Sequence, residues 1–280
     1  IKELVTEASQ LVENGAKEIN LLGQNVNAYN YKEKKLSNLI LEISKIKNFK
    51  RIRYTTSHPG DFTEDLIEAH KNCEKLMPLI HLPVQSGSNK ILEEMNRKHT
   101  VEEYLAIIKK LIKVKPEIKC SSDFIIGYPG ETDSDFKKTV ELMTEVGFIN
   151  SFSFIFSARP GTPAFNLNKV DNKVAKDRLI EFQRIAEKTK TNYRKELIKK
   201  TVKVLFENKM KTGNNYFGRD EYFNSVIAES EIDITGKIKN VKILKGNQNT
   251  LFGEIVQNFN QTNYAASVSY THLTLPTTPY

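Results

Sequence analysis

The chain has 280 residues, of which 39% are hydrophobic and 27% are charged, and its formal net charge is +8. This globular composition contains no apolar run approaching the roughly 20 residues of a membrane helix, so we expect a cytoplasmic protein without a membrane partner. The two cysteines, Cys73 and Cys120, lie too far apart to form a metal-binding spacing or a disulfide framework.

Residues 3–200 alternate between helical and strand patterns. The predicted strands cover 19–23, 51–57, 78–84, 121–127 and 151–157, and the predicted helices cover 4–12, 36–46, 64–70, 101–114, 133–146 and 172–200. Alternation at this spacing indicates βαβ units and therefore the α/β class. We predict that residues 1–200 form a partial (β/α) barrel of five strand–helix units.

The five loops that follow the predicted strands are rich in Gly, Pro, Ser and Asn. Their sequences are GQNVNAY, SHPGD, QSGSN, GYPGET and SARPGTPA. In parallel α/β folds the loops after the strand ends form the binding site. Any one of these loops is explained by turn chemistry alone, but five at the same topological place predict a site.

The last helical segment of this region is strongly basic. Residues 169–200 contain eleven Lys or Arg and five Asp or Glu, a net charge of +6. The segment is either a solvated helix face or an arm that approaches phosphate groups, and the charge alone does not decide between them.

From residue 201 the pattern changes to short alternating β-runs separated by Gly and Asn. We predict a small all-β barrel over 201–256. Residues 257–280 contain no Lys, Arg, Asp or Glu, and their sequence is typical of read-through rather than of a folded domain, so we expect a non-native-looking or disordered tail.

Five sequence blocks carry a family resemblance, in this order along the chain. They are LLGQNVNAY (21–29), YTTSHPGD (54–61), HLPVQSGSNKILEEMNRKHT (81–100), SSDFIIGYPGET (121–132) and FSFIFSARPGTPA (152–164). Together they resemble the radical-SAM methylthiotransferase family over residues 1–256. The predicted small barrel resembles the TRAM domain that closes this family.

The block at 21–29 resembles the branch that acts on tRNA. That branch adds a methylthio group to C2 of N6-isopentenyl-adenosine beside the anticodon. Two other branches stay open, one acting on threonylcarbamoyl-adenosine in tRNA and one on a ribosomal protein. A non-catalytic RNA-binding protein and a cofactor-free pseudoenzyme are the alternatives from another class.

The resemblance implies S-adenosylmethionine and two 4Fe-4S clusters as cofactors, with an electron donor such as flavodoxin or ferredoxin. The family holds its radical-forming cluster with a CxxxCxxC loop, which would precede Ile1. We therefore expect the chain as given to be inactive, with no metal ligand and no catalytic residue that can be named. The oligomeric state stays open.

The resemblance also implies cofactor-binding residues in the strand-end loops. Gln24 and Asn25 are expected near the methionine part of the cofactor, and Gln85 and Ser86 near its ribose or carboxylate. A turn role is the alternative for each loop. The remaining expected cofactor residues are Asp123, Ile125 and Gly127, on a strand resembling the adenine-contacting strand, and Arg97, whose guanidinium fits a carboxylate.

Glu131 is interpreted either as a ligand or as a cap of the following helix. The basic residues expected to contact RNA lie on the SARPGTPA loop, on the basic helix and on the small barrel. They are Arg159, Lys195, Lys199, Lys200 and Arg219.

Overall fold

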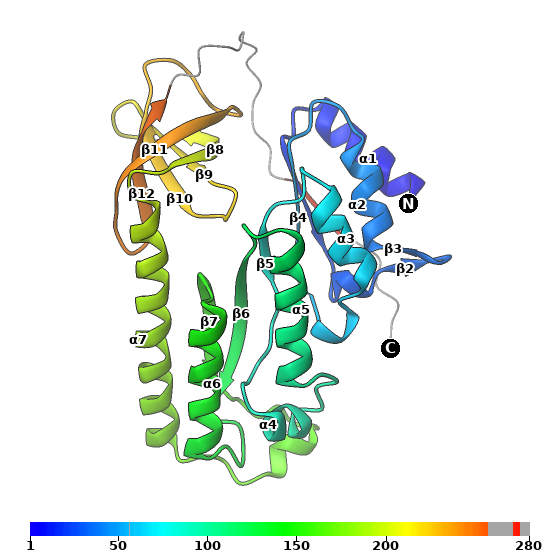
Figure 1. Cartoon of the computed structure of the whole chain (residues 1–280), viewed down its shortest axis with the longest axis vertical. Helices are drawn as coiled ribbons and strands as arrows, with labels where there is room; N and C mark the ends of the chain where they lie inside the picture. The colour runs from blue at the N-terminus through cyan, green and yellow to red at the C-terminus, as the bar shows by residue number, and fades with distance from the viewer. Residues whose placement is uncertain (56, 257–270, 275–280) are drawn as a thin grey trace. The chain divides into compact units, whose positions relative to one another are not determined.

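The computed structural model describes residues 1–55, 57–256 and 271–274, the last four as backbone only. The described chain divides into two compact units, each of which is discontinuous in sequence. Unit 1 contains described residues of 1–56, 63–79 and 191–280, and unit 2 contains 57–62 and 80–190. The elements of both are labelled in Figure 1.

The α/β part of unit 1 is built on two parallel strands, β1 and β4. Glu18 lies opposite Arg51, and Leu21 lies opposite Tyr54. Helices α1, α2 and α3 pack beside these strands, and a short hairpin of β2 and β3 precedes α2 (Figure 1). The bounds are α1 Lys2–Glu13, β1 Glu18–Leu22, η1 Val26–Ala28, β2 Asn30–Tyr31, β3 Lys34–Lys35, α2 Leu36–Ser44, β4 Arg51–Tyr54 and α3 Glu64–Asn72.

Strand β13, Thr271–Thr274, lies on the other side of β1 and runs parallel to it. These four residues are therefore ordered as a strand, and the prediction that the tail is non-native-looking stays a prediction. The strand forms because the outer edge of β1 presents N–H and C=O groups that can pair with a further strand. The rest of the predicted tail, residues 257–270 and 275–280, lies outside the described residues.

The C-terminal part of unit 1 is a closed five-stranded barrel in the order β10-β12-β11-β8-β9. Two glycines allow neighbouring strands to approach closely. A Cβ at Gly218 would lie 2.4 Å from the Leu205 carbonyl oxygen, and one at Gly253 would lie 2.4 Å from that of Lys242. The strands are β8 Thr201–Lys209, β9 Asn215–Arg219, β10 Ser225–Glu229, β11 Ile238–Gly246 and β12 Thr250–Val256.

A buried charged cluster forms one face of the β1–β4 pair. Arg51, only 2% exposed, and Arg53 point to the same face as Glu18, because side chains two residues apart share a face. Arg53 Nε lies 2.9 Å from Glu18 Oε1, and Arg51 Nη1 lies 3.7 Å from Glu18 Oε2. One carboxylate therefore faces two guanidinium groups.

The small barrel completes the hydrogen bonding of these two arginines. Arg51 donates to the carbonyls of Arg219 (3.0 Å) and Lys203 (2.8 Å). Arg53 donates to the carbonyl of Asp220 at 3.0 Å. Because backbone carbonyls carry partial negative charge, they stabilise the second cation that Glu18 does not neutralise. The barrel is thus held onto the α/β part by polar contacts.

Unit 2 is built on the three-stranded sheet β5-β6-β7, in which β6 and β7 are parallel. The apolar face of β6 carries Phe124, whose ring packs against Phe148 at 5.5 Å and Phe182 at 4.7 Å between centroids. Its elements are η2 Pro59–Asp61, β5 Leu79–His81, α4 Asn89–Glu94, α5 Val101–Val114, β6 Lys119–Ile126, α6 Asp133–Val146, β7 Asn150–Ile155 and η3 Pro163–Asn166.

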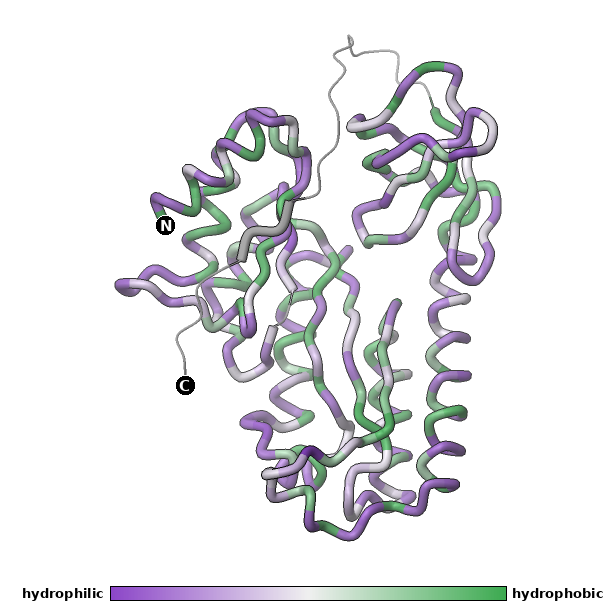
Figure 2. Tube along the Cα trace, turned by 180° about the vertical axis from the view of Figure 1, so that it is seen from behind, coloured by the Kyte–Doolittle hydropathy of each residue, from purple (hydrophilic) through white to green (hydrophobic). Residues whose placement is uncertain are grey.

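Helix α7, Asn172–Leu197, is shared by the two units, with residues from Thr191 onward in unit 1. Hydrophilic and hydrophobic turns alternate along it (Figure 2), as expected for a helix with one buried face. Phe182 is fully buried, while Ile180 is exposed.

The predicted α/β class, the five strand segments and the small β-barrel are confirmed. The barrel and the β1–β4 part belong to one compact unit. Helices α5 and α6 have the predicted bounds because each begins with a capping box, Thr100 with Glu103 and Thr132 with Asp135. The sequence did not predict α4, which has only six residues and no side-chain cap bond.

Replacing Glu18 by Gln should lower the free energy of unfolding by about 3–5 kcal/mol, because two buried guanidinium groups would lose the carboxylate that faces them both. Glu42→Gln, which removes an exposed partner of Lys45, is the matched control and should change it by about 0.5 kcal/mol or less. Urea unfolding monitored by circular dichroism measures both. Equal effects of the two substitutions would contradict the role assigned to Glu18.

Candidate functional site

The open face of the unit 2 sheet combines polar and aromatic side chains. Asp123 on β6 is opposite Phe152 on β7, and Ile125 is opposite Phe154. The two phenylalanines are 48% and 59% exposed, which is unusual for rings on a strand. An exposed aromatic pair beside a carboxylate suits a planar ligand that also carries hydrogen-bond donors.

Gln85 is tied to this face by its backbone. Its N–H donates to the Asp123 carbonyl at 3.0 Å, and its carbonyl accepts from the Ile125 N–H at 2.9 Å. Its φ of +75° is a conformation that L-residues rarely adopt. The structure therefore brings together three of the predicted cofactor residues, Gln85, Asp123 and Ile125.

Ser86, by contrast, turns its hydroxyl into the interior. Its Oγ accepts from the Ser88 N–H at 3.2 Å and lies 3.4 Å from Thr139 Oγ1. The Gly87 N–H donates to the same threonine oxygen at 3.0 Å. These hydrogen bonds connect the loop after β5 to helix α6. The hydroxyl of Ser86 therefore stabilises the conformation of the loop.

Asp135 is the centre of this fastening network. Ser88 Oγ donates to its carboxylate at 2.6 Å, and Thr132 donates through both its hydroxyl (2.6 Å) and its N–H (3.0 Å). Burial raises the pKa of Asp135, but the hydrogen bonds from Ser88 and Thr132 outweigh it and bring the pKa to about 2. The ionised form is therefore the one that holds the loop.

Gly127 and Glu131 form a second fastening point. Both Glu131 carboxylate oxygens accept from the Gly127 N–H, at 3.1 and 3.2 Å, and Oε1 lies 2.8 Å from Arg178 Nη1. Burial raises the pKa of Glu131, against the effect of these two donors. Gly127 has a φ of +73°, and a Cβ there would lie 2.8 Å from Ala175 Cβ. The amide of Gly127 is thus engaged internally, and Glu131 holds a loop while Thr132 caps the helix.

Arg97 follows α4 and is half-buried, and burial lowers its pKa. Burial, with the nearby charge of Arg97, lowers the pKa of His58, and burial, His58 and Arg97 bring that of His99 to about 4. The two imidazoles meet edge to face, 5.5 Å between centroids. Among the described residues Arg97 forms no ion pair, and a half-buried cation of this kind suits an anionic ligand group.

Gln24 and Asn25 follow β1 and belong to unit 1. Gln24 is exposed, and Asn25 precedes the short helix η1, where its carbonyl accepts from the Ala28 N–H at 3.2 Å. Their role near the cofactor stays a prediction.

The residues expected to contact RNA differ in their surroundings. Arg159, Lys195, Lys199 and Lys200 are exposed. Arg219 is held by Glu207 at 3.2 Å, and its guanidinium lies over the rings of Phe217 (5.3 Å) and Phe223 (4.3 Å). These contacts give Arg219 a packing role within the barrel.

Two further arginines of the basic helix are also engaged internally. Arg178 pairs with Glu131 and Asp133 in unit 2. Arg194 donates to the carbonyls of Asn247, Gln248 and Asn249 in unit 1. The charge of the helix available to a partner is therefore smaller than its sequence indicates.

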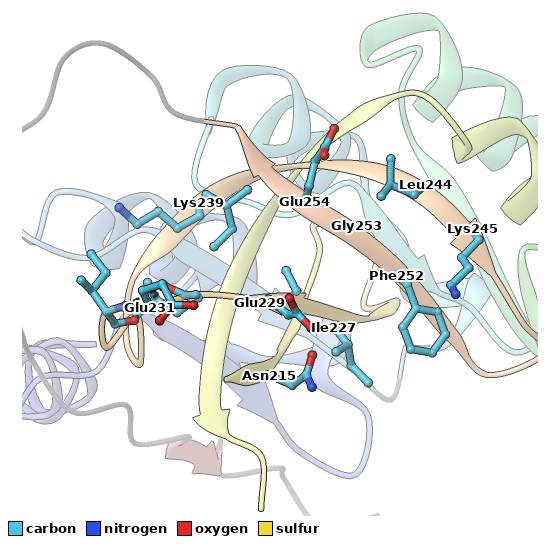
Figure 3. Close-up of a pocket in the computed structure, with 15 residues that line it drawn as sticks. Asn215, Ile227, Glu229, Glu231, Lys239, Leu244, Lys245, Phe252, Gly253 and Glu254 are labelled. Carbon is cyan, nitrogen blue, oxygen red and sulfur yellow. Dashed lines mark hydrogen bonds between the residues drawn. The ribbon is translucent and has the colours of Figure 1, made fainter. Parts of the chain in front are cut away.

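A groove of about 810 Å³ crosses the small barrel (Figure 3). Its charged lining residues are Glu229, Glu231 and Glu254, with Lys239 and Lys245. Because carboxylates outnumber ammonium groups here, this groove does not favour a phosphate backbone. The exposed lysines of the α7–β8 junction are the better candidates.

No described group of three or more His, Cys, Asp or Glu side chains could hold a metal ion. Cys73 and Cys120 are both buried and free, and burial raises the pKa of Cys120 to about 12. A thiol that stays protonated is a poor ligand for iron, so Cys120 does not fit an iron–sulfur cluster. Cys73 belongs to no described group of ligand side chains. Every helix in the described part of the chain is too short or too polar to span a lipid bilayer.

The sequence pattern alone did not single out His81 and Phe152, which also lie on the open face of the sheet. Ile80 is buried, so the strand period places His81 on the opposite face. The two-residue period, applied to the predicted strand 151–157, places Phe152 and Phe154 on one face. This period is the sequence signal that could have identified the aromatic pair.

The family model of the radical SAM superfamily matches residues 1–143, half of the chain. The chain belongs to this superfamily. Its similarity to curated proteins is narrower. It is 54% identical over 259 residues to the tRNA-2-methylthio-N(6)-dimethylallyladenosine synthase of Pelagibacter ubique, covering 91% of this chain and 58% of that protein.

A synthase of the same name from a Wolbachia of Brugia malayi is 49% identical over 264 residues, covering 92% of this chain and 60% of the relative. The chain therefore spans about three-fifths of the length of these relatives. Among solved structures, coproporphyrinogen III oxidase (HemN) from Escherichia coli, described as a radical SAM enzyme, matches with a TM-score of 0.53 at 13% identity. That match covers 78% of this chain and 59% of the other, and it supports the fold alone.

Replacing Asp135 by Asn should lower the free energy of unfolding by about 1–3 kcal/mol at pH 6, because the buried carboxylate accepts from Ser88 and Thr132. The folded pKa lies below the unfolded value of 3.8, so the contribution is complete above that value and disappears as the pH falls through about 2. Urea unfolding at several pH values measures the difference between the two proteins.

Glu141→Gln, on the exposed side of the same helix, is the control and should have little effect at any pH. A stability difference for Asp135→Asn that persists unchanged from pH 6 to pH 2 would contradict the assignment.

Proposed function

We propose that the complete protein is a radical-SAM methylthiotransferase that adds a methylthio group to C2 of N6-dimethylallyladenosine in tRNA. The observation that carries the proposal is the similarity to synthases of this name, at 42–54% identity over about nine-tenths of the chain. The motif order, from LLGQNVNAY to SARPGTPA, supports the same assignment. A cytoplasmic location is part of the proposal, because tRNA is the substrate.

The open face of unit 2 fits S-adenosylmethionine, which supplies the radical-forming and methyl-donating chemistry when bound. Asp123 offers a carboxylate to hydroxyl groups, and Phe152 and Phe154 offer rings to a flat base. Arg97 would pair with the cofactor carboxylate, since the described residues give it no ion-pair partner. Gln24 and Asn25 belong to unit 1, and their expected role at the methionine part of the cofactor rests on the family resemblance alone.

The described residues contain no group of side chains that could hold an iron–sulfur cluster, and both cysteines, Cys73 and Cys120, are buried. The complete protein would have to supply those ligands from outside the residues 1–280, together with contacts to an electron donor.

The tRNA would be held by the exposed lysines near the α7–β8 junction. Lys195, Lys199 and Lys200 lie within six residues of one another and are all exposed. A cluster of this kind attracts phosphate without reading sequence. Arg159 would add a contact from unit 2.

The direct test is expression of the complete protein in a bacterium lacking endogenous methylthiolation, followed by mass spectrometry of its tRNA nucleosides. We expect 2-methylthio-N6-dimethylallyladenosine to appear. Appearance of a methylthiolated threonylcarbamoyl-adenosine or of a modified ribosomal protein instead would move the protein to another branch. Tight tRNA binding without any modification would favour a non-catalytic RNA-binding protein.

Replacing Arg97 by Gln should weaken binding of S-adenosylhomocysteine about 10- to 100-fold, the usual effect of losing a hydrogen bond between charged groups. Lys98→Gln, one residue away and exposed, is the matched control and should bind normally. Isothermal titration calorimetry on the complete protein measures both. Equal affinities would remove Arg97 from the site.

Changing Lys195, Lys199 and Lys200 to Glu should weaken tRNA binding and flatten its salt dependence, with the slope falling by about one for each phosphate that the lysines neutralise. The control replaces three exposed lysines of α5, Lys109, Lys110 and Lys113, and makes the same change in net charge. Filter binding at several salt concentrations gives the slopes. If both triple variants behave alike, the effect is one of total charge and the junction does not bind the tRNA.

A further inference from the structure

One histidine of the unit 2 sheet, His81, is engaged at both ring nitrogens. Its Nδ1 lies 2.9 Å from the hydroxyl oxygen of Ser121, and its Nε2 lies 3.4 Å from Asp123 Oδ1. The three side chains come from two strands, since His81 ends β5 and the other two belong to β6. The three side chains lie in the order Ser121, His81, Asp123, and the Asp123 carboxylate is partly exposed.

The strand period explains this arrangement. Ser121 and Asp123 are two residues apart and share one face of β6, while Ser122 and Phe124 point into the core. The ring of Phe152 approaches His81 edge to face, with 6.1 Å between centroids. The imidazole is thus fixed by a hydroxyl on one nitrogen and by an aromatic neighbour on its side.

Asp123 is the member that faces outward. Its side chain is 31% exposed, and among the described residues His81 is the single cationic or potentially cationic group within ion-pairing distance. A carboxylate on an open strand face can turn about two side-chain bonds, and binding a ligand would have to immobilise it. A ring nitrogen 3.4 Å from one oxygen restricts that rotation in advance, which reduces the cost and leaves the other oxygen for the ligand.

We propose that His81 is a positioning residue for Asp123: anchored by Ser121, it orients the Asp123 carboxylate to accept hydrogen bonds from the ribose hydroxyls of the bound nucleoside cofactor. This inference rests on the proposed function, from which the identity of the nucleoside comes. Carboxylates commonly accept hydrogen bonds from ribose hydroxyls in nucleotide-binding proteins. His81 itself touches no ligand and acts through Asp123.

The test measures binding of S-adenosylhomocysteine to the complete protein by isothermal titration calorimetry. His81→Phe keeps an aromatic ring beside Phe152 but removes the nitrogen donors, and it should weaken binding about 10-fold. His81→Gln keeps an N–H donor of similar reach and should stay within about 3-fold of the original affinity. A purely structural role would not distinguish these two variants by their donors.

The coupling to Asp123 is tested by a double-mutant cycle. Asp123→Asn should weaken binding, and the double variant His81→Phe/Asp123→Asn should be no weaker than Asp123→Asn alone, because His81 acts only through that carboxylate. Independent, multiplicative losses would overturn the inference, as would normal binding by His81→Phe. If His81→Phe does not fold, Ser121→Ala takes its place in the cycle and should show the same lack of additivity.

Failure of the proposed function has a different signature. If the original protein does not bind S-adenosylhomocysteine at all, the nucleoside site itself is wrong. If it binds and His81→Phe binds equally well, the site stands and the positioning role of His81 is wrong.

Discussion

The two-residue period of the β-strand is the constraint on which both units depend. Each parallel strand of the α/β core must bury one face against helices, and the side chains between the buried ones are then turned to the opposite face. In β1 the buried residues Ile19 and Leu21 leave Glu18 and Asn20 on that face, and in β6 Ser122 and Phe124 leave Ser121 and Asp123 there. The polar side chains of these strands therefore lie on one face of each sheet.

The two units use this polar face in different ways. In unit 1 the cluster of Glu18, Arg51 and Arg53 is buried and its donors reach carbonyls of the small barrel. The guanidinium groups of both arginines are hydrogen-bonded inside the protein and are not available to a ligand. In unit 2 the carboxylate of Asp123 remains partly exposed beside two aromatic rings, so this face keeps its capacity for binding.

The loops next to the unit 2 face are held by carboxylates. Asp135 fastens the loop after β5, and Glu131 fastens the loop after β6. The two carboxylates differ in balance, because hydrogen bonds dominate at Asp135 and lower its pKa, whereas burial dominates at Glu131 and raises its pKa. Both carboxylates are buried, whereas the Asp123 side chain stays partly exposed.

The basic helix shows why residue type is a weak guide to role. Arg178 and Arg194 satisfy a buried carboxylate and a set of loop carbonyls, while Lys195 and Lys199 remain at the surface. Arg fits such buried forks because its guanidinium is planar and carries five donors, and Lys is more readily left hydrated. The basic residues of this segment thus serve two purposes. The arginines named above form internal hydrogen bonds, and the lysines form a surface suited to RNA.

The sequence by itself determined the features that depend on neighbours along the chain. The capping boxes at Thr100 and Thr132 set the starts of two helices, the apolar runs predicted five strands, and the change of period at residue 201 indicated the barrel. Only the tertiary structure decided which polar groups are engaged internally and which stay open to a ligand. Ser86 and Gly127 turned inward, Arg219 became part of an aromatic stack, and β13 paired with β1. These outcomes depend on partners distant in sequence, and no local pattern encodes the distance between such partners in space.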